Sequence, residues 1–180
     1  DFYSVSSQKT RVLELDGPLE GNDTISVAIL STYSMAGATN VEVLEYQGKE
    51  NSNLTGNSGA NTIYGGLLVR NTIDGAADDD YLYGGDTTDS LFGGAGDDTL
   101  VVTQWTDTIL VGALGTTLRS AKGSDTLAGG EGDDWYVVNS QTAYNYQDSE
   151  GINTIASTVD FSLKYNPNIA ANIQNLYLIG

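Results

Sequence analysis

Apolar side chains recur at every ninth position through the middle of the chain. Counted in blocks of nine from Gly75, the eighth position is apolar in seven consecutive blocks: Leu82, Leu91, Leu100, Ile109, Leu118, Leu127 and Tyr136. The sixth position is acidic in six of these blocks: Asp80, Asp89, Asp98, Asp107, Asp125 and Asp134, with Thr116 as the exception. The pattern continues backwards to Asn71 and, after one extra residue near Gly65, to Asn61. A polar linker has no reason to keep such a spacing, so the pattern predicts a repetitive fold.

Two of the blocks share a fuller motif. Residues 93–101 and, 36 positions later, residues 129–137 both read Gly-Gly-x-Gly-x-Asp-x-apolar-x. The blocks that begin at Gly75 and Gly84 match this motif in part. The repeated motif resembles the nonapeptide of the RTX (repeats-in-toxin) hemolysin-type calcium-binding proteins. The resemblance implies an all-β fold: a right-handed parallel β-roll, or β-solenoid, with Ca²⁺-binding turns and additional β-strand segments at its flanks.

Each block is expected to form a turn followed by a short strand. The x-apolar-x tripeptide at its end suits a strand whose central side chain points inward, and Gly in the turn allows positive φ and close backbone approach. Two blocks complete one coil, so equivalent turns lie 18 residues apart. One edge of the roll then carries Asp80, Asp98, Thr116 and Asp134, and the other carries Asn71, Asp89, Asp107 and Asp125.

The resemblance also implies that several Ca²⁺ ions lie between stacked turns, held by sixth-position carboxylates and by backbone carbonyls. Hard oxygen ligands of this kind suit Ca²⁺. The best carboxylate pairs are Asp80 with Asp98, Asp89 with Asp107, and Asp107 with Asp125. Asn61 and Asn71 offer only a neutral oxygen. The candidate metal-binding residues are Asp80, Asp89, Asp98, Asp107, Asp125, Asp134, Asn71, Asn61, Gly75, Gly84, Gly85, Gly93, Gly94, Gly96, Gly123, Gly129, Gly130 and Gly132.

Two groups of residues fit the repeat less well. Asp78, Asp79, Asp97 and Asp133 lie beside the sixth positions and are expected to be solvated or to lie behind the ligands. The stretch from Val102 to Lys122 keeps Asp107, Ile109 and Leu118 in register but has Trp105 where the motif has Gly. It forms either two irregular coils or a loop that bulges out of the roll, and irregular coils are the favoured interpretation.

The composition excludes several classes of function. The 180 residues include 24 acidic and 7 basic side chains, a formal charge of -17, so nucleic acid and anionic membranes would be repelled. No apolar run approaches the length of a membrane span, so membrane insertion is not expected. The chain has neither His nor Cys, which removes disulfides, thiolate zinc sites and His-based catalysis. Because no Ser or Thr has a His partner and the acidic residues follow the repeat, the chain is not expected to be an enzyme.

The flanks of the repeat region resemble each other. Residues 1–5, 21–25 and 40–44 parallel residues 134–138, 151–155 and 172–176, at offsets of 130 to 133. The predicted organisation is a flanking β-strand segment at 1–55, the calcium-binding β-roll at 56–137, and a second flanking segment at 138–180 that is similar to 1–48. Neither end looks capped, which suits a fragment of a larger protein or a building block that self-associates head to tail.

The expected function is that of an extracellular calcium-binding structural module. A thin roll buries little apolar surface and stacks carboxylates that repel one another, so Ca²⁺ binding should supply folding free energy. The chain would then be largely disordered at cytosolic Ca²⁺ and fold after secretion, which in the resembling family follows the type I route. The parent would be a surface adhesin, filament or layer protein. Alternatives are a C-terminal secretion or folding module of a secreted enzyme or toxin, and a glycan-binding adhesin domain that uses Trp135 and neighbouring Tyr side chains.

Overall fold

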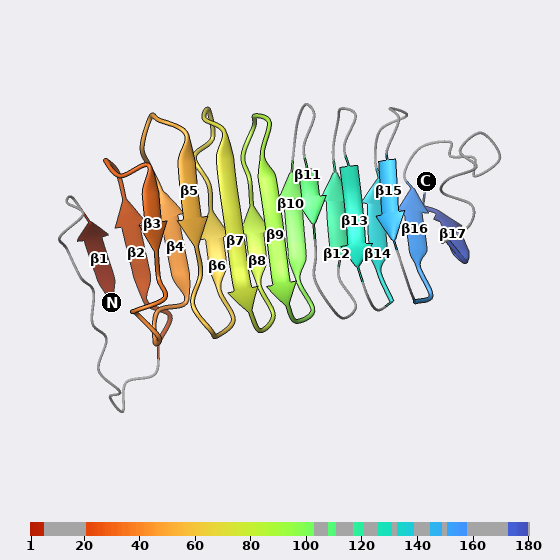
Figure 1. The fold of residues 1–180 in the computed structure, drawn as a ribbon, viewed down its shortest axis with the longest axis horizontal. Coiled ribbons are helices and arrows are strands. Elements are labelled where there is room, and N and C mark those ends of the chain that lie inside the picture. The colour runs from red at the N-terminus through yellow and green to blue at the C-terminus, as the bar shows by residue number, and fades with distance from the viewer. Residues whose placement is uncertain are drawn as a thin grey trace.

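The protein is a stack of short parallel strands (Figure 1). The computed structural model describes residues 1–5, 21–102, 108–110, 117–120, 126–130, 133–138, 145–148, 151–157 and 173–179. Within these ranges every regular element is a β-strand, and the strands form two parallel sheets of ten and seven strands. Among the described residues, no helix is long and apolar enough to cross a membrane. The predicted all-β solenoid is confirmed.

The ten-stranded sheet runs along one side of the stack. Its strands, in spatial order, are β1 (Phe2–Val5), β2 (Thr24–Val27), β4 (Val43–Tyr46), β6 (Thr62–Tyr64), β8 (Tyr81–Tyr83), β10 (Thr99–Val102), β12 (Thr117–Ser120), β14 (Trp135–Val138), β16 (Thr154–Ser157) and β17 (Asn175–Leu178). The seven-stranded sheet contains β3 (Thr32–Ser34), β5 (Ser52–Thr55), β7 (Asn71–Ala77), β9 (Ser90–Ala95), β11 (Thr108–Leu110), β13 (Thr126–Gly130) and β15 (Asn145–Asp148). From β2 to β16 the chain alternates between the sheets, so each coil contributes one strand to each.

The strand register confirms that two nonapeptides make one coil. Leu82 of β8 pairs with Leu100 of β10, and Leu91 of β9 pairs with Ile109 of β11, each 18 residues further along the chain. The extra residue predicted near Gly65 lengthens the coils around it to 19, because Leu54 pairs with Ile73 and Ile63 with Leu82. An added residue is therefore absorbed in a turn without disturbing the inward positions of the strands.

The core of the described coils is a narrow column of inward side chains, to which a strand contributes one or two. Leu82, Leu91, Leu100 and Tyr136 were predicted to point inward and are completely buried. The same column is built on both sides by Ile25, Leu44, Leu54, Ile63, Ile73 and Ile155. Burying one such side chain contributes about 1.5–3 kcal/mol. A core this narrow leaves the turns to be stabilised by other means.

The irregular stretch between β10 and β13 continues the solenoid. β11 pairs with β9 and β13, and β12 pairs with β10 and β14, all in parallel and without a shift of register. The favoured interpretation of coils, as opposed to a loop that bulges out, is therefore confirmed. Trp105 and Thr116 lie outside the described residues.

The two flanks occupy equivalent places in the ten-stranded sheet. Phe2, Thr24 and Val43 lie side by side on β1, β2 and β4, and the predicted counterparts Trp135, Thr154 and Asn175 lie side by side on β14, β16 and β17. The sequence similarity between the flanks thus reflects a structural repeat. Both flanks join the sheet of the central repeats, so the solenoid extends past the blocks that match the motif.

Candidate metal centre

The sixth-position Asp side chains link each turn to the turn one coil earlier. Oδ1 of Asp98 accepts a hydrogen bond of 2.9 Å from the backbone N–H of Asp80, and Oδ1 of Asp80 accepts one of 2.8 Å from the N–H of Asn61. On the opposite edge, Oδ1 of Asp89 accepts a 2.8 Å bond from the N–H of Asn71. One carboxylate oxygen thus satisfies a buried amide that no strand neighbour reaches. The predicted pairing of Asp80 with Asp98 on one edge, and the placing of Asn71 with Asp89 on the other, agree with this geometry.

The second oxygen of these carboxylates has a different environment. Oδ2 of Asp80 and Oδ2 of Asp98 are buried and have no hydrogen-bond partner. The two side chains are only 3% and 1% exposed. A buried anionic oxygen without a partner is costly, so proteins pair such an oxygen with a proton or a cation.

Burial favours the protonated form of these side chains in the absence of a cation. Burial raises the pKa of Asp80 to about 7, the N–H of Asn61 opposes this rise, and the Asp98, Asp78 and Asp74 charges add to it. Burial likewise raises the pKa of Asp98 to about 6, opposed by the N–H of Asp80. The pKa of Asp89 is also raised by burial. Carboxylates in such surroundings gain from a nearby positive charge.

The first Gly of each block leaves room for the carboxylate. A Cβ atom on Gly75 would collide with Oδ2 of Asp80 and with the carbonyl oxygen of Gly93, which belongs to the next coil. Gly93 stands in the same relation to Oδ2 of Asp98, and Gly84 to Oδ2 of Asp89. The motif therefore needs Gly at this position because the acidic side chain folds back against its own turn.

In the blocks that begin at Gly75 and Gly93, the second and fourth positions adopt positive φ. Gly94 and Gly96 have φ of 109° and 137°, which Gly adopts without strain. The block that begins at Gly75 has Ala76 and Asp78 at these positions, with φ of 88° and 70°. The carbonyl oxygens of Ala76 and Asp78 lie against Gly94 and Gly96 of the next turn. Backbone oxygens and carboxylate oxygens therefore meet where one turn stacks on the next.

This arrangement fits a calcium ion. Within the part of the chain that the structure describes, no three His, Cys, Asp or Glu side chains converge on one point, so side chains alone do not form a metal centre. Where the turns at 75–80 and 93–98 stack, the unpartnered Oδ2 of Asp80 and the carbonyl oxygen of Gly93 instead lie against the same side of Gly75, and the unpartnered Oδ2 of Asp98 lies against Gly93. An all-oxygen set of carboxylates and carbonyls is the ligand chemistry of Ca²⁺. These residues would hold the ion between the two turns.

The other predicted ligands have varied placements. Asp134 is buried, and its N–H donates to Oδ1 of Asn153 over 2.9 Å. Gly129 and Gly130 end strand β13. Asp107, Asp125, Gly123 and Gly132 lie outside the described residues. Among the flanking acidic residues, exposed Asp79 accepts a 2.8 Å bond from the N–H of Asp97, and Asp133 accepts one of 2.8 Å from the N–H of Ile152.

Asn61 and Asn71, the two neutral candidates, are both buried but make different bonds. Oδ1 of Asn61 accepts a 2.7 Å bond from the N–H of Asn57 and lies beside Gly56. In the acidic turns a carboxylate oxygen occupies the equivalent place, as Oδ2 of Asp80 does beside Gly75. Asn71 is oriented differently. The polar atom of its side chain that lies beside Gly65 is the amide nitrogen, not the oxygen. Asn61 therefore presents an oxygen toward the next turn, whereas Asn71 presents N–H groups.

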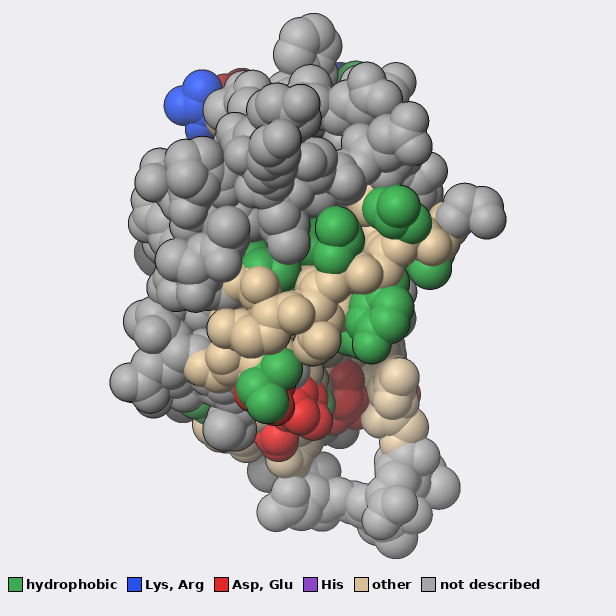
Figure 2. All heavy atoms as spheres, turned by 90° about the vertical axis from the view of Figure 1, so that its right-hand side faces the viewer, with side chains coloured by type: hydrophobic (Ala, Val, Ile, Leu, Met, Phe, Trp, Pro, Cys, Tyr) green, Lys and Arg blue, Asp and Glu red, His purple; other side chains and the backbone are tan. Residues whose placement is uncertain are grey.

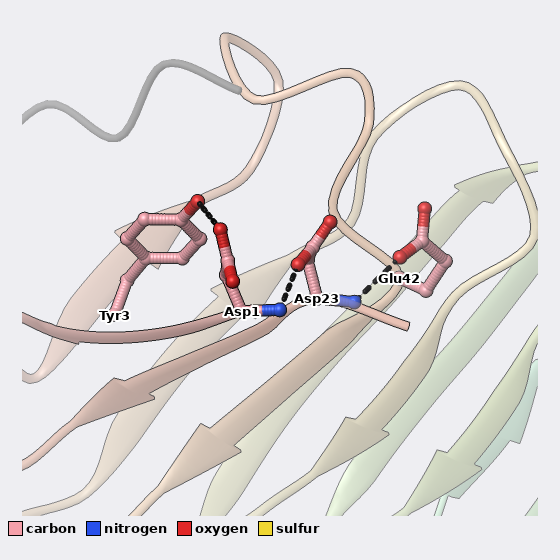
Figure 3. A network of polar contacts seen from close by, with 4 residues as sticks. All are labelled: Asp1, Tyr3, Asp23 and Glu42. Carbon is pink, nitrogen blue, oxygen red and sulfur yellow. Dashed lines mark hydrogen bonds and ion pairs between the residues drawn. The ribbon is translucent and has the colours of Figure 1, made fainter. Parts of the chain in front are cut away.

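The same inter-coil bonding extends into the flanks, where the repeat does not predict it. The N–H of Asp23 donates to Oε2 of Glu42 over 2.8 Å, and Asp23 in turn accepts from the main-chain nitrogen of Asp1 (Figure 3). At the other end the N–H of Asn153 donates to Oε1 of Gln174 over 2.7 Å. Each of these residues directly precedes a strand of the ten-stranded sheet. Because their side-chain types differ, a search for a repeated residue type does not find them. Their shared place, one residue before a strand, is the sequence signal that could have identified them.

The comparisons with known proteins agree with the geometry. The hemolysin-type family model, described as the RTX calcium-binding nonapeptide repeat (4 copies), matches residues 48–67, 70–100 and 111–141. No curated protein and no solved structure matches the chain. The matched ranges contain the turns that bear Asp80, Asp89 and Asp98, and the calcium-binding repeats form the centre of the solenoid. Residues 48–141 therefore consist of repeats of the RTX calcium-binding nonapeptide family.

Proposed function

We propose that this β-roll is a structural module of an exported protein, which completes its folding when it meets extracellular calcium. The observation that carries the proposal is the pair of buried Oδ2 atoms of Asp80 and Asp98, which face stacked turns without a hydrogen-bond donor. With the ion absent, these carboxylates destabilise the stack at neutral pH. With the ion bound, they become its ligands.

The acidic composition supports folding outside the cell. A formal charge of -17 opposes compaction, and bound divalent cations offset part of it. Extracellular calcium modules bind with dissociation constants of about 10⁻⁴–10⁻³ M, well above the calcium concentrations that cytosolic sensors detect. A module in this range stays incompletely folded during export and folds on the outside. We propose several bound ions, one for each pair of stacked acidic turns.

The proposed role is mechanical and not catalytic. The buried acidic residues of the central coils, Asp80, Asp89 and Asp98, accept hydrogen bonds from the preceding coil, which suits a rigid spacer in a surface adhesin, filament or layer protein. A folding module attached to a secreted enzyme or toxin is the alternative. A glycan-binding role is a further alternative. Tyr136 is buried and offers a sugar ring no surface to stack on, whereas Trp135 is exposed and stacks on Tyr177 with ring centroids 5.8 Å apart.

One surface favours assembly into a longer stack. Hydrophobic side chains gather on the end of the solenoid that carries β17 (Figure 2). Tyr177, Leu178 and Ile179 are each more than half exposed there. Another coil, from a second copy or from a longer chain, would cover them. Light scattering in calcium tests the self-association of residues 1–180: we expect species larger than 19.0 kDa, and a Leu178→Asp variant should be monomeric.

Circular dichroism and calorimetric titration test the calcium proposal directly. We expect the β signal to increase from chelator to millimolar calcium, with several ions bound per chain. Magnesium is the control cation, because it is smaller, demands octahedral geometry and dehydrates reluctantly. An unchanged spectrum together with no measurable calcium binding would reject the proposal.

A further inference from the structure

We propose that Asn71 takes the place of a calcium ion, so that one junction between two turns of the roll is closed by an amide and needs no metal. The Asn71 junction is defined here as the contact between the turns at 65–71 and 84–89. The Asp80 junction is the contact between the turns at 75–80 and 93–98, on the opposite edge. The inference rests on the proposed calcium binding at the Asp80 junction and departs from the sequence-based assignment of Asn71 as a ligand.

The amide nitrogen of Asn71 is surrounded by oxygen atoms. Nδ2 lies 2.9 Å from the carbonyl oxygen of Gly66 and 2.8 Å from that of Val69, both in its own turn. It lies 2.5 Å from the carbonyl oxygen of Gly84 and 3.0 Å from Oδ1 of Asp89, both in the next turn. Three carbonyls and a carboxylate are also the ligand types that calcium prefers. Here the two amide hydrogens are shared among these acceptors.

The Asp80 junction shows what happens at the equivalent place without an amide. Oδ2 of Asp80 and the carbonyl oxygen of Gly93 both crowd the open side of Gly75. Nδ2 of Asn71 and the carbonyl oxygen of Gly84 stand in the same way beside Gly65, at 2.9 Å and 2.6 Å from the position of an added Cβ. Two oxygens that face each other need a cation between them, whereas a nitrogen donor binds the facing carbonyl directly.

The rest of the Asn71 side chain is also fully used. Its Oδ1 accepts a 2.8 Å bond from the N–H of Gly66 and a 2.7 Å bond from the hydroxyl of Ser52 in the preceding coil. The side chain is completely buried. Since both amide atoms are bonded and the nitrogen already donates to carbonyls, Asn71 has no oxygen left to offer a metal ion. An Asp at this position would keep the Oδ1 bonds and replace the donor by an anionic oxygen.

The test is to convert the amide into a carboxylate. In Asn71→Asp, native mass spectrometry in calcium should count one more ion per chain than in the wild type. In chelator the variant should lose β structure relative to the wild type, and calcium should restore it. Asn71→Ala should be destabilised in both solutions, because neither a donor nor a ligand remains. Rescue by calcium of the Asp variant alone separates a cation substitute from an ordinary buried amide.

Asn51→Asp is the matched control, because Asn51 is exposed and lies one coil earlier, where the same charge should add no ion. An Asn71→Asp ion count equal to the wild type, or failure of calcium to restore its β structure, would overturn the inference. A wild type that binds no calcium would instead reject the proposed function. The two failures are therefore distinguishable from one set of spectra.

Discussion

The Asn71 and Asp80 junctions share a backbone arrangement but are closed by different chemistry. In both, the backbone N–H of the named residue donates over about 2.8–2.9 Å to an Asp Oδ1 one coil later, Asp89 or Asp98. At Asn71 a neutral amide nitrogen reaches the carbonyl of Gly84, whereas at Asp80 a buried carboxylate oxygen faces that of Gly93. We infer from this difference that a coil closed by an amide nitrogen, as at Asn71, does not require calcium. A coil closed by a buried carboxylate, as at Asp80, is expected to require it.

Removing calcium should separate the two junctions most strongly. A ligand at 100 times its dissociation constant stabilises the folded state by about 2.7 kcal/mol, which corresponds to roughly 100-fold slower hydrogen exchange. We therefore expect chelation to accelerate exchange of the Asp80 amide by about this factor. The amides of Asn71 and Gly66, which are bonded to Asp89 and to the Asn71 side chain, should accelerate much less. Equal acceleration at both junctions would remove the distinction.

Neutralising one ligand should have opposite effects with and without calcium. Asp98→Asn keeps an Oδ1 atom for the N–H of Asp80 but removes a buried anionic oxygen. In calcium we expect the variant to lose about 1–3 kcal/mol, because the ion loses a charged ligand. In chelator we expect it to be more stable than the wild type, because the uncompensated charge is gone. Thermal unfolding in both solutions measures the two signs.

Asp97→Asn provides the control for that experiment. Asp97 is the neighbouring acidic residue, and it is exposed, so the same loss of charge should change stability little in either solution. If Asp98→Asn destabilised the protein equally in calcium and in chelator, Oδ2 of Asp98 would have no role as a metal ligand.

The repeat made much of the fold predictable, because one nine-residue period specifies both the inward-facing positions of the strands and the acidic positions of the turns. The inward column that contains Leu82 and Leu100, and the edges that carry Asp80 and Asp89, follow from counting. The flanks could be matched to each other but not to the repeat, since their coils are 19 to 22 residues long and the period is lost. Glu42 and Gln174 share with the Asp residues only an acceptor oxygen in the same place.

The role of Asn71 could not be read from the sequence for a geometric reason. Counting places it on the edge with Asp89, and an amide offers both an oxygen and a nitrogen. Which atom faces the next turn depends on carbonyls of Gly66 and Gly84, which are 18 residues apart and meet only when the coils stack. Sequence spacing therefore locates the junctions but does not say which of them contain a metal ion.

Acidification should stabilise the calcium-free Asp80 junction. The pKa of Asp80 is raised to about 7 and that of Asp98 to about 6, above the ordinary value of 3.8. These two carboxyl groups thus bind protons more tightly in the folded state than in the unfolded state, so their contribution to stability is greatest below pH 3.8 and is lost as pH rises through 6 to 7. In chelator we expect a higher unfolding midpoint at pH 5 than at pH 7.5. In calcium the trend should reverse, because the ligands must be deprotonated.

This pH window is favourable because the chain has no His and no Cys to titrate within it. The double variant Asp80→Asn with Asp98→Asn should lose most of the dependence in chelator. A dependence that survived the double substitution would assign the effect to other carboxylates.

The smallest effect concerns the backbone of the acidic turn. Ala76 adopts φ of 88°, which an L-residue reaches only with strain, and its exposed methyl group contributes little packing. Ala76→Gly should therefore raise the free energy of unfolding in calcium by about 0.5–1 kcal/mol, after the larger chain entropy of Gly is subtracted. Ala77, the next residue along β7, is not among the residues with positive φ. Ala77→Gly should then lower stability by a similar amount.

The pair of Ala variants also probes the metal site, since the carbonyl of Ala76 lies against Gly94 in the adjoining turn of the Asp80 junction. If calcium holds that carbonyl in place, the gain from Ala76→Gly should be larger in calcium than in chelator, where the turn is free to relax and release the strain. The Asn71 junction contains no such residue, because Gly85, with φ of 115°, already occupies the corresponding position of its second turn. A gain of equal size in both solutions would mean that the strain belongs to the turn alone, independent of the ion beside it.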